Sequence, residues 1–174
     1  MCSSDQQGYN SILTSIKDLI DELSLKSDKK YSVGICTPGT LSKDSGLLNN
    51  SNTQCLTGKP IQTDLEVILE QKVSIENDAN CFALAETKLG AAKNSNIVFG
   101  VIMGTGVGGG IMINEKIHHG RSGIAGEWGH HCIHNNGNSC YCGKKGCVEA
   151  YISGPALEKQ WYGLTGLKQS LPEI

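Results

Sequence analysis

The feature that most constrains the fold is the segment EWGHHCIHNNGNSCYCGKKGC, residues 127–147. From about residue 114 to 146 the chain is rich in Gly, His, Asn and Cys and has little periodic apolar pattern. Something other than a large apolar core must therefore order this stretch. His130 precedes Cys140 by ten residues, and Cys142 and Cys147 follow closely. One imidazole and three thiolates suit tetrahedral zinc, so the spacing predicts a metal site.

The predicted ion is structural, because four protein ligands leave no position open for a reactive water. His131 and His134 are rival ligands, and spacing alone does not choose among the three histidines. The alternative is a set of ordinary buried or surface thiols beside a solvent histidine. The remaining thiols are scattered along the chain: Cys2, Cys36, Cys55, Cys81 and Cys132. Clustering of the other three favours metal over disulfides in a reducing compartment.

Bulk composition excludes several classes of function. The 174 residues carry fifteen Lys and Arg against seventeen Asp and Glu, a formal charge of −2, with no long run of either sign. Neither a nucleic-acid partner nor a membrane surface is expected. The N-terminus lacks the basic and apolar regions of a signal peptide, and no apolar stretch approaches the roughly 20 residues of a membrane span. A cytoplasmic location is expected.

Apolar periodicity predicts alternating helices and strands. Helices are expected at 11–23, 63–71, 77–90 and within 147–163, and strands at 30–36, 73–76, 97–103 and 110–114. Thr63 or Asp64 is the expected cap of the second helix. Residues 37–60 are dense in turn formers and should be irregular, with short strands at most. This order belongs to the α/β class.

The glycine run GTGVGGG, residues 104–110, lies between two strand-like segments. It resembles neither a Walker loop nor a Rossmann turn, which opens a helix. Successive backbone N–H groups of glycines can surround an anion, so one interpretation is a phosphate cradle in a hairpin. The other is a tight hairpin or bulge without a ligand.

Asp78 is expected where a strand ends and a helix begins, the edge at which α/β folds place ligands. A carboxylate there could accept a proton from a substrate hydroxyl that attacks phosphorus. The alternative role is a helix N-cap. Asn77 and Asn80 carry the same two interpretations.

Glu127 and Glu149 flank the predicted zinc site. If the metal ties both segments together, the two carboxylates converge and could bind sugar hydroxyls. The alternative is a pair of solvated surface acids. Trp128 could stack on a sugar face, although a single tryptophan more often belongs to a core.

Several of these stretches resemble the ROK family of sugar kinases and related repressors, over about residues 34–154. The motifs that carry the resemblance are GICTPGTLSKDSG, Asn52 with GKP downstream, ENDANCFALAE, GTGVGGG, GEWGHH and CYCGKKGCVEAYISG. GTLSKDSGLLNNSN and GEWGH are most similar to bacterial fructokinases of broad hexose specificity. GKP and NDANCFAL are also similar to N-acetylglucosamine kinases.

The resemblance implies an actin-like, ribonuclease H-like ATPase fold of two lobes with a zinc-stabilised insertion. Residues 1–77 would belong to the first lobe and residues 78–174 to the second. ATP and Mg2+ would phosphorylate the 6-hydroxyl of a hexose. Dimers are common in the family, so the resemblance leaves a homodimer open.

The resemblance also assigns roles to individual residues. Asp78 matches the general base, and the metal ligands match His130, Cys140, Cys142 and Cys147. Sugar-binding positions match Asn52, Asn77, Glu127, His130 and Glu149. The loop facing the ATP phosphates matches Gly104, Thr105, Gly106 and Gly108.

The chain departs from the family at both ends. Family kinases begin with a strand-turn-strand carrying Asp-x-Gly-Gly-Thr, and nothing like it precedes residues 11–23. The sequence also stops after LPEI, short of the usual C-terminal segment. We therefore expect a family fragment that lacks half of the nucleotide site. The alternatives are an inactive kinase fragment, a sugar-sensing domain of the repressor type, or a zinc-stabilised interaction module.

Overall fold

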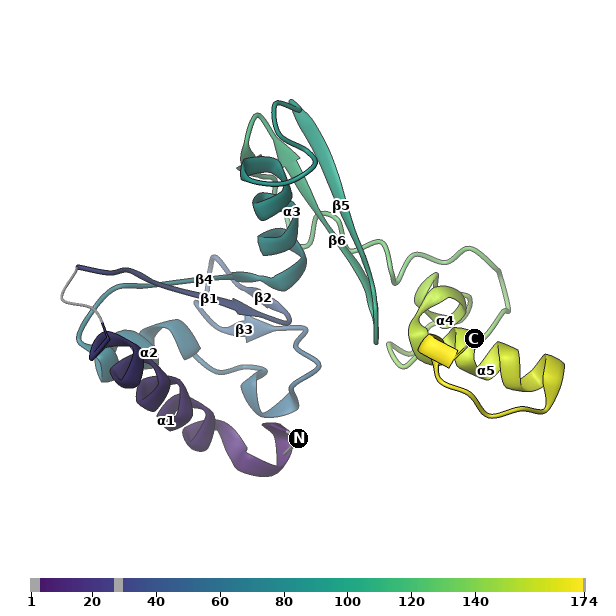
Figure 1. Ribbon diagram of the computed structural model, residues 1–174, viewed down its shortest axis with the longest axis horizontal. Helices are drawn as coiled ribbons and strands as arrows, with labels where there is room; N and C mark the ends of the chain where they lie inside the picture. The colour runs from purple at the N-terminus through teal and green to yellow at the C-terminus, as the bar shows by residue number, and fades with distance from the viewer. Residues whose placement is uncertain (1–3, 27–29, 174) are drawn as a thin grey trace. The chain divides into compact units, whose positions relative to one another are not determined.

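A computed structural model describes residues 4–26 and 30–173, with side chains from residue 8 onward (Figure 1). Cys2 lies outside the described residues. The chain divides into two compact units, Met1–Asp78 and Ala79–Ile174, and each is described by itself. The assignment of residues 1–77 and 78–174 to two lobes stays a prediction.

The first unit combines helices with short strands, in the predicted order. Its elements are α1 (Ser4–Ser24), β1 (Val33–Thr37), β2 (Thr40–Leu41), β3 (Leu48–Asn49), a 3-10 turn η1 (Gln54–Leu56), α2 (Ile61–Leu69) and β4 (Val73–Asn77). β1 and β4 run parallel, with Val33 opposite Val73 and Thr37 opposite Asn77. β2 and β3 form an antiparallel hairpin within the stretch predicted to be irregular.

The core of the first unit lies where α1 and α2 pack together beside the strands (Figure 1). Its buried members are Leu13, Leu48, Leu56, Ile61, Leu65 and Val73. Only part of the predicted apolar stripe of α1 takes part. Leu13 is buried, whereas Leu19 and Leu23 are more than half exposed. The helix also begins earlier than residue 11, and Gly8 interrupts it with a positive φ.

The predicted cap of the second helix is wrong. α2 begins at Ile61 after Pro60, two residues before Thr63, and no side chain caps it. Proline suits the start of a helix because it has no N–H that would need a partner there. Asp64 instead accepts a hydrogen bond of 2.6 Å from the Tyr9 hydroxyl, which links α2 to α1.

The second unit begins with a helix packed on a hairpin (Figure 1). α3 (Asp78–Lys88) starts at the unit boundary, and β5 (Ile97–Met103), β6 (Val107–Ile113) and β7 (Lys116–Ile117) form an antiparallel sheet in that order. Glycines allow the close approach of helix and hairpin. A Cβ on Gly110 would lie 2.6 Å from the Ala79 carbonyl oxygen, and one on Gly100 would lie 2.8 Å from the Ala83 Cβ.

The rest of the second unit is a long irregular segment followed by two helices. α4 (Glu149–Ile152) and α5 (Gly154–Thr165) follow residues 118–148, and a 3-10 turn η2 (Leu171–Glu173) follows α5. Ser153 caps α5 by accepting a hydrogen bond from the Ala156 backbone N–H. Within the described parts of the chain, no helix is both long and apolar enough to cross a membrane.

Candidate functional site

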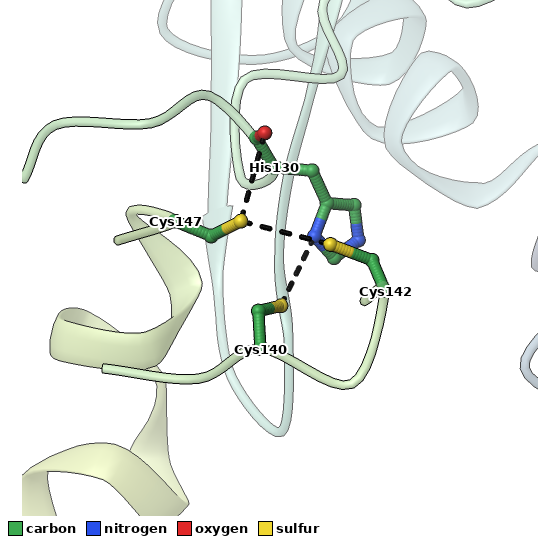
Figure 2. Close-up of side chains that lie close together, drawn as sticks. All are labelled: His130, Cys140, Cys142 and Cys147. Atoms are coloured by element: carbon green, nitrogen blue, oxygen red, sulfur yellow. Dashed lines mark hydrogen bonds between the residues drawn. The ribbon is translucent and has the colours of Figure 1, made fainter. Parts of the chain in front are cut away.

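The irregular segment brings the four predicted metal ligands together (Figure 2). The ligand atoms of His130, Cys140, Cys142 and Cys147 all lie within 4.8 Å of one another. The Cys140 Sγ is 3.6 Å from the His130 Nδ1, and the Cys142 Sγ is 3.6 Å from the Cys147 Sγ. The loop from Cys142 to Cys147 turns sharply at both ends, where Gly143 and Gly146 take a positive φ. These turns bring the two thiols back toward each other.

The spacing of these atoms fits tetrahedral zinc. With Zn–S bonds of about 2.3 Å, a regular tetrahedron has S···S edges of about 3.8 Å. The S···S distance of 3.6 Å between Cys142 and Cys147 is close to that value. Zn–N bonds are shorter, at about 2.0–2.1 Å, so a slightly shorter S···N edge is expected, and Cys140 Sγ lies 3.6 Å from His130 Nδ1. An imidazole with three thiols is also the donor set that zinc prefers in structural sites. The cluster is therefore consistent with a structural zinc ion.

The thiols differ in how readily they ionise. Burial, together with hydrogen bonds to Cys142 and Cys140, raises the pKa of the Cys147 thiol to about 12. A backbone hydrogen bond at Lys144 lowers the pKa of Cys142. A thiol that binds zinc is deprotonated, because the charge of the ion stabilises the thiolate. Of these two thiols, Cys147 therefore depends more on a bound cation for its ionisation.

The rival histidines lie outside the cluster. The His134 ring packs against Tyr151, with ring centroids 5.2 Å apart, and both His131 and His134 are exposed. His130 alone of the three presents a ring nitrogen to the thiols. Spacing could not make this distinction, because it depends on the turn that follows Trp128, where the His131 N–H bonds to the Trp128 carbonyl.

Tyr141 is a neighbour of the cluster that the sequence analysis did not single out. Its hydroxyl is 3.2 Å from the His130 Nε2, so it can fix the orientation of the ring whose Nδ1 faces the thiols. Partial burial raises the pKa of Tyr141, and nearby negative charge adds to this effect, in the order Glu149, Cys140, Cys142 and Glu127. The two carboxylates thus act on the same phenol. The only sequence signal for Tyr141 was its place between two ligands.

Glu149 is buried, and its carboxylate faces the hairpin. Glu149 Oε2 accepts a hydrogen bond of 2.8 Å from the Val107 N–H, while Glu127 is exposed. Trp128 has a structural role. Its indole N–H donates to the Gly108 carbonyl over 2.8 Å, and its ring contacts Phe99 edge to face at 6.2 Å.

The predicted phosphate loop is the turn between β5 and β6. Gly104, Thr105 and Gly106 are exposed at this turn, and Gly108 lies in β6 facing Ala79 of α3. The Gly104 N–H bonds to the Gly106 carbonyl at 2.9 Å, and the Gly104 carbonyl accepts from the Gly154 N–H at 2.7 Å. The strand-turn-strand arrangement matches the predicted hairpin. Phosphate binding by its backbone stays a prediction.

In the first unit, Asn77 and Asp78 lie at the carboxyl end of the parallel β1–β4 pair. Asn77 is the last residue of β4 and is buried, and Asp78 is exposed at the start of α3. The Asn77 side-chain amide donates to the Gly39 carbonyl over 3.1 Å. This holds the turn after β1 against the end of β4. Parallel strands place their ligand sites at this edge.

Asn52 is exposed and lies in the turn after β3, three residues beyond Asn49. Gly39 has a positive φ, and a Cβ there would lie 2.5 Å from the Asn49 carbonyl oxygen and 3.0 Å from the Ser51 nitrogen. The turn at Gly39 therefore touches both Asn77 and the segment that leads to Asn52. Asn80, the other amide considered at the helix start, is buried in α3 beside Gly110.

Comparisons with known proteins agree with this geometry. Residues 2–172 match the ROK family. An N-acetyl-D-glucosamine kinase of Pectobacterium carotovorum is 37% identical over 176 residues, which cover 95% of this chain and 57% of the relative. The ROK hexokinase of Thermus thermophilus is 30% identical with a TM-score of 0.82, over 96% of this chain and 56% of that one.

A third relative has been solved with ligands. A ROK family glucokinase from Streptomyces griseus, in complex with glucose and AMPPNP, is 32% identical with a TM-score of 0.75, over 91% of this chain and 52% of that one. The chain thus spans just over half the length of these relatives.

Together, the fold and the His/Cys cluster define an α/β structure of the actin-like ATPase class with a zinc motif. The chain belongs to the ROK family. The predicted resemblance to that family is confirmed. The particular likeness to fructokinases is not confirmed, since the relatives described above are named N-acetylglucosamine kinase, hexokinase and glucokinase.

Proposed function

We propose that this chain carries the sugar site and part of the nucleotide site of an ATP-dependent hexose kinase that phosphorylates the 6-hydroxyl. Asp78 acts as the general base that accepts the hydroxyl proton. The loop of Gly104, Thr105, Gly106 and Gly108 faces the ATP phosphates, whose charge Mg2+ offsets. Zinc has a structural role, and the proposed sugar-binding residues are Asn52, Asn77, Glu127, His130 and Glu149.

One observation carries the proposal more than any other: Asp78 follows directly on the carboxyl end of β4. The register of β1 with β4 puts Thr37 and Asn77 side by side at this end, and Asn77 is anchored on Gly39. A carboxylate at such an edge is well placed to receive a ligand. The kinases among the relatives support phosphoryl transfer as the reaction.

For the sugar, N-acetylglucosamine is the first candidate and glucose the second. The curated relative at 37% identity is named for the former, and the Streptomyces griseus relative binds the latter. Fructose and mannose complete the panel because the motifs GTLSKDSGLLNNSN and GEWGH resemble fructokinases of broad specificity.

The experiment measures ATP-dependent phosphorylation of these four sugars by the chain and by Asp78→Asn. Asparagine caps a helix about as well as aspartate, so the variant keeps α3 and loses only the base. We expect turnover to fall at least about 100-fold with an unchanged melting temperature. Asp18→Asn, which removes an exposed carboxylate on α1, is the matched control and should keep full turnover.

Each other outcome has a definite meaning. Turnover that Asp78→Asn leaves intact would reject Asp78 as the base and leave it as a helix cap. Calorimetric binding of a sugar without any turnover would favour a sugar sensor or an inactive kinase fragment. A chain that binds none of the four sugars would be an interaction module stabilised by zinc.

A further inference from the structure

The turn between β5 and β6 is held at both ends by the segment that follows the last zinc ligand. The Gly154 N–H bonds to the Gly104 carbonyl at one end, over 2.7 Å. At the other end the Val107 N–H bonds to Glu149 Oε2, over 2.8 Å. Glu149 and Gly154 are the first residues of α4 and α5. One short stretch of chain therefore brackets the whole turn.

The same stretch is tied to the metal cluster. Cys147 is fully buried two residues before Glu149 and lies in an antiparallel bridge with Cys132. The Val148 N–H bonds to the His131 carbonyl at 3.0 Å, and the Glu149 N–H bonds to the Gly129 carbonyl at 2.9 Å. The segments that carry His130 and Cys147 thus run side by side. An ion bound by both residues would cross-link these segments next to the Glu149 backbone.

Two glycines make room for this junction. A Cβ on Gly106 would lie 2.8 Å from Glu149 Oε2, and a Cβ on Gly129 would overlap the Val107 carbonyl oxygen. The clash at Gly129 is with backbone, so that position excludes a larger residue, whereas a side chain at Gly106 would have to displace the Glu149 carboxylate. The buried Glu149 carboxylate also needs a hydrogen-bond donor, since an unpaired charge is costly away from water. The Val107 N–H supplies one as a charge-assisted hydrogen bond.

We infer that Glu149 is a positioning residue that couples the metal cluster to the turn Gly104–Gly106. Metal bound at His130 and Cys147 fixes Glu149, and Glu149 fixes the Val107 end of the turn. A turn ordered in advance binds an anion with a smaller loss of entropy. Resting on the proposed function, the inference adds that zinc tightens the binding of a nucleoside triphosphate. It gives Glu149 a role distinct from contact with the sugar.

The direct test is amide hydrogen exchange at Val107, measured by NMR on the whole zinc-loaded chain. Glu149→Asp keeps the charge but shortens the side chain by one methylene, so exchange should accelerate at least about tenfold. Glu149→Gln keeps the length and an oxygen acceptor, so protection should largely remain. Stripping zinc from the unaltered chain with a chelator should accelerate Val107 as much as Glu149→Asp does.

The matched control is Glu158→Ala on α5. Glu158 Oε1 accepts from the Leu171 N–H over 2.9 Å, so this variant also removes a carboxylate that holds a backbone amide, away from the hairpin. Val107 exchange should stay unchanged there. The zinc content of every variant is measured in parallel and should stay at one ion per chain. Equal protection of Val107 in Glu149→Asp, or after zinc removal, would overturn the coupling.

A second measurement separates this inference from the proposed kinase function. Calorimetry with AMPPNP and Mg2+ should show a dissociation constant about tenfold higher for Glu149→Asp than for Glu149→Gln. If the unaltered chain binds no nucleotide, the proposed function fails, whereas the exchange result at Val107 still decides the coupling. Stronger protection in Glu149→Asp than in Glu149→Gln would show that charge alone matters and would reject the hydrogen bond.

Discussion

In the first unit, six buried apolar side chains from α1, β3, η1, α2 and β4 meet in one core, with Leu48 and Leu65 fully buried. In the second unit, residues 118–146 have only two buried members, Gly129 and Gly146. That segment is held instead by backbone hydrogen bonds and by the contacts among His130, Cys140, Cys142 and Cys147.

The difference teaches that one chain can order its parts by separate means. Burial of apolar surface stabilises the first unit by about 25 cal/mol for each Å² removed from water. A segment whose apolar side chains are at most partly buried gains little from this source, and its ordering costs roughly 1–2 kcal/mol per residue in backbone entropy. Metal ligation can offset that cost, because structural zinc contributes directly to folding.

The largest effect is expected from removing the metal. A chelator, or Cys147→Ser, should abolish zinc binding and unfold residues 118–146, because no apolar core replaces the lost ligands. Hydrogen exchange with mass spectrometry should show protection lost there and kept in α1, α2 and β4. Cys36→Ser, which alters an exposed thiol in β1, is the control and should keep its zinc. Equal loss of protection in both units would remove the distinction between them.

A smaller effect, in the opposite unit, is expected from Leu65→Ala. Leu65 is fully buried in α2, so the cavity should cost about 3 kcal/mol of unfolding free energy. Zinc content should stay at the value of the unaltered chain. Val67→Ala on the same helix is the control, since Val67 is 72% exposed and its loss should cost under about 0.5 kcal/mol. Zinc lost along with the core in denaturant titrations of Leu65→Ala would contradict independent ordering.

The same contrast explains what the sequence could predict. The period of apolar residues located α2, α3, β5 and β6 to within a few residues, because it reflects the burial that forms them. The cluster of cysteines was equally visible, since its ligands lie within eighteen residues of one another. These features depend on neighbours along the chain.

Features that depend on distant partners escaped prediction. Asp64 was considered as a cap of α2, but its carboxylate accepts a hydrogen bond from Tyr9, which is 55 residues away in the sequence. Glu149 reaches Val107 across 42 residues, and Leu19 and Leu23 continue the stripe of α1 without being buried. Periodicity shows which face of a helix is apolar. It does not show how much of that face a neighbour covers.

The smallest effect tests whether a polar link adds to the apolar core of the first unit. Burial, followed by the hydrogen bond and charge of Asp64, raises the pKa of Tyr9 above its ordinary value of 10.0. Tyr9→Phe should cost about 1 kcal/mol of unfolding free energy at neutral pH. Tyr31→Phe, at an exposed position, is the control and should cost under about 0.5 kcal/mol.

The dependence on pH gives this prediction its sign. Because the folded pKa of Tyr9 is the higher one, the stabilisation is complete below pH 10 and is lost as pH rises above it, when the unfolded tyrosine ionises first. The gap in unfolding free energy between the unaltered chain and Tyr9→Phe, measured in denaturant at pH 7 to 11, should therefore narrow above about pH 10. A gap that widens with pH would mean that Asp64 stabilises the ionised phenol, which the charge on a carboxylate forbids. A gap near zero at pH 7 would mean that the hydrogen bond from Tyr9 to Asp64 adds nothing to the stability of the first unit. Apolar burial would then stabilise that unit without help from this polar link, in full contrast to residues 118–146.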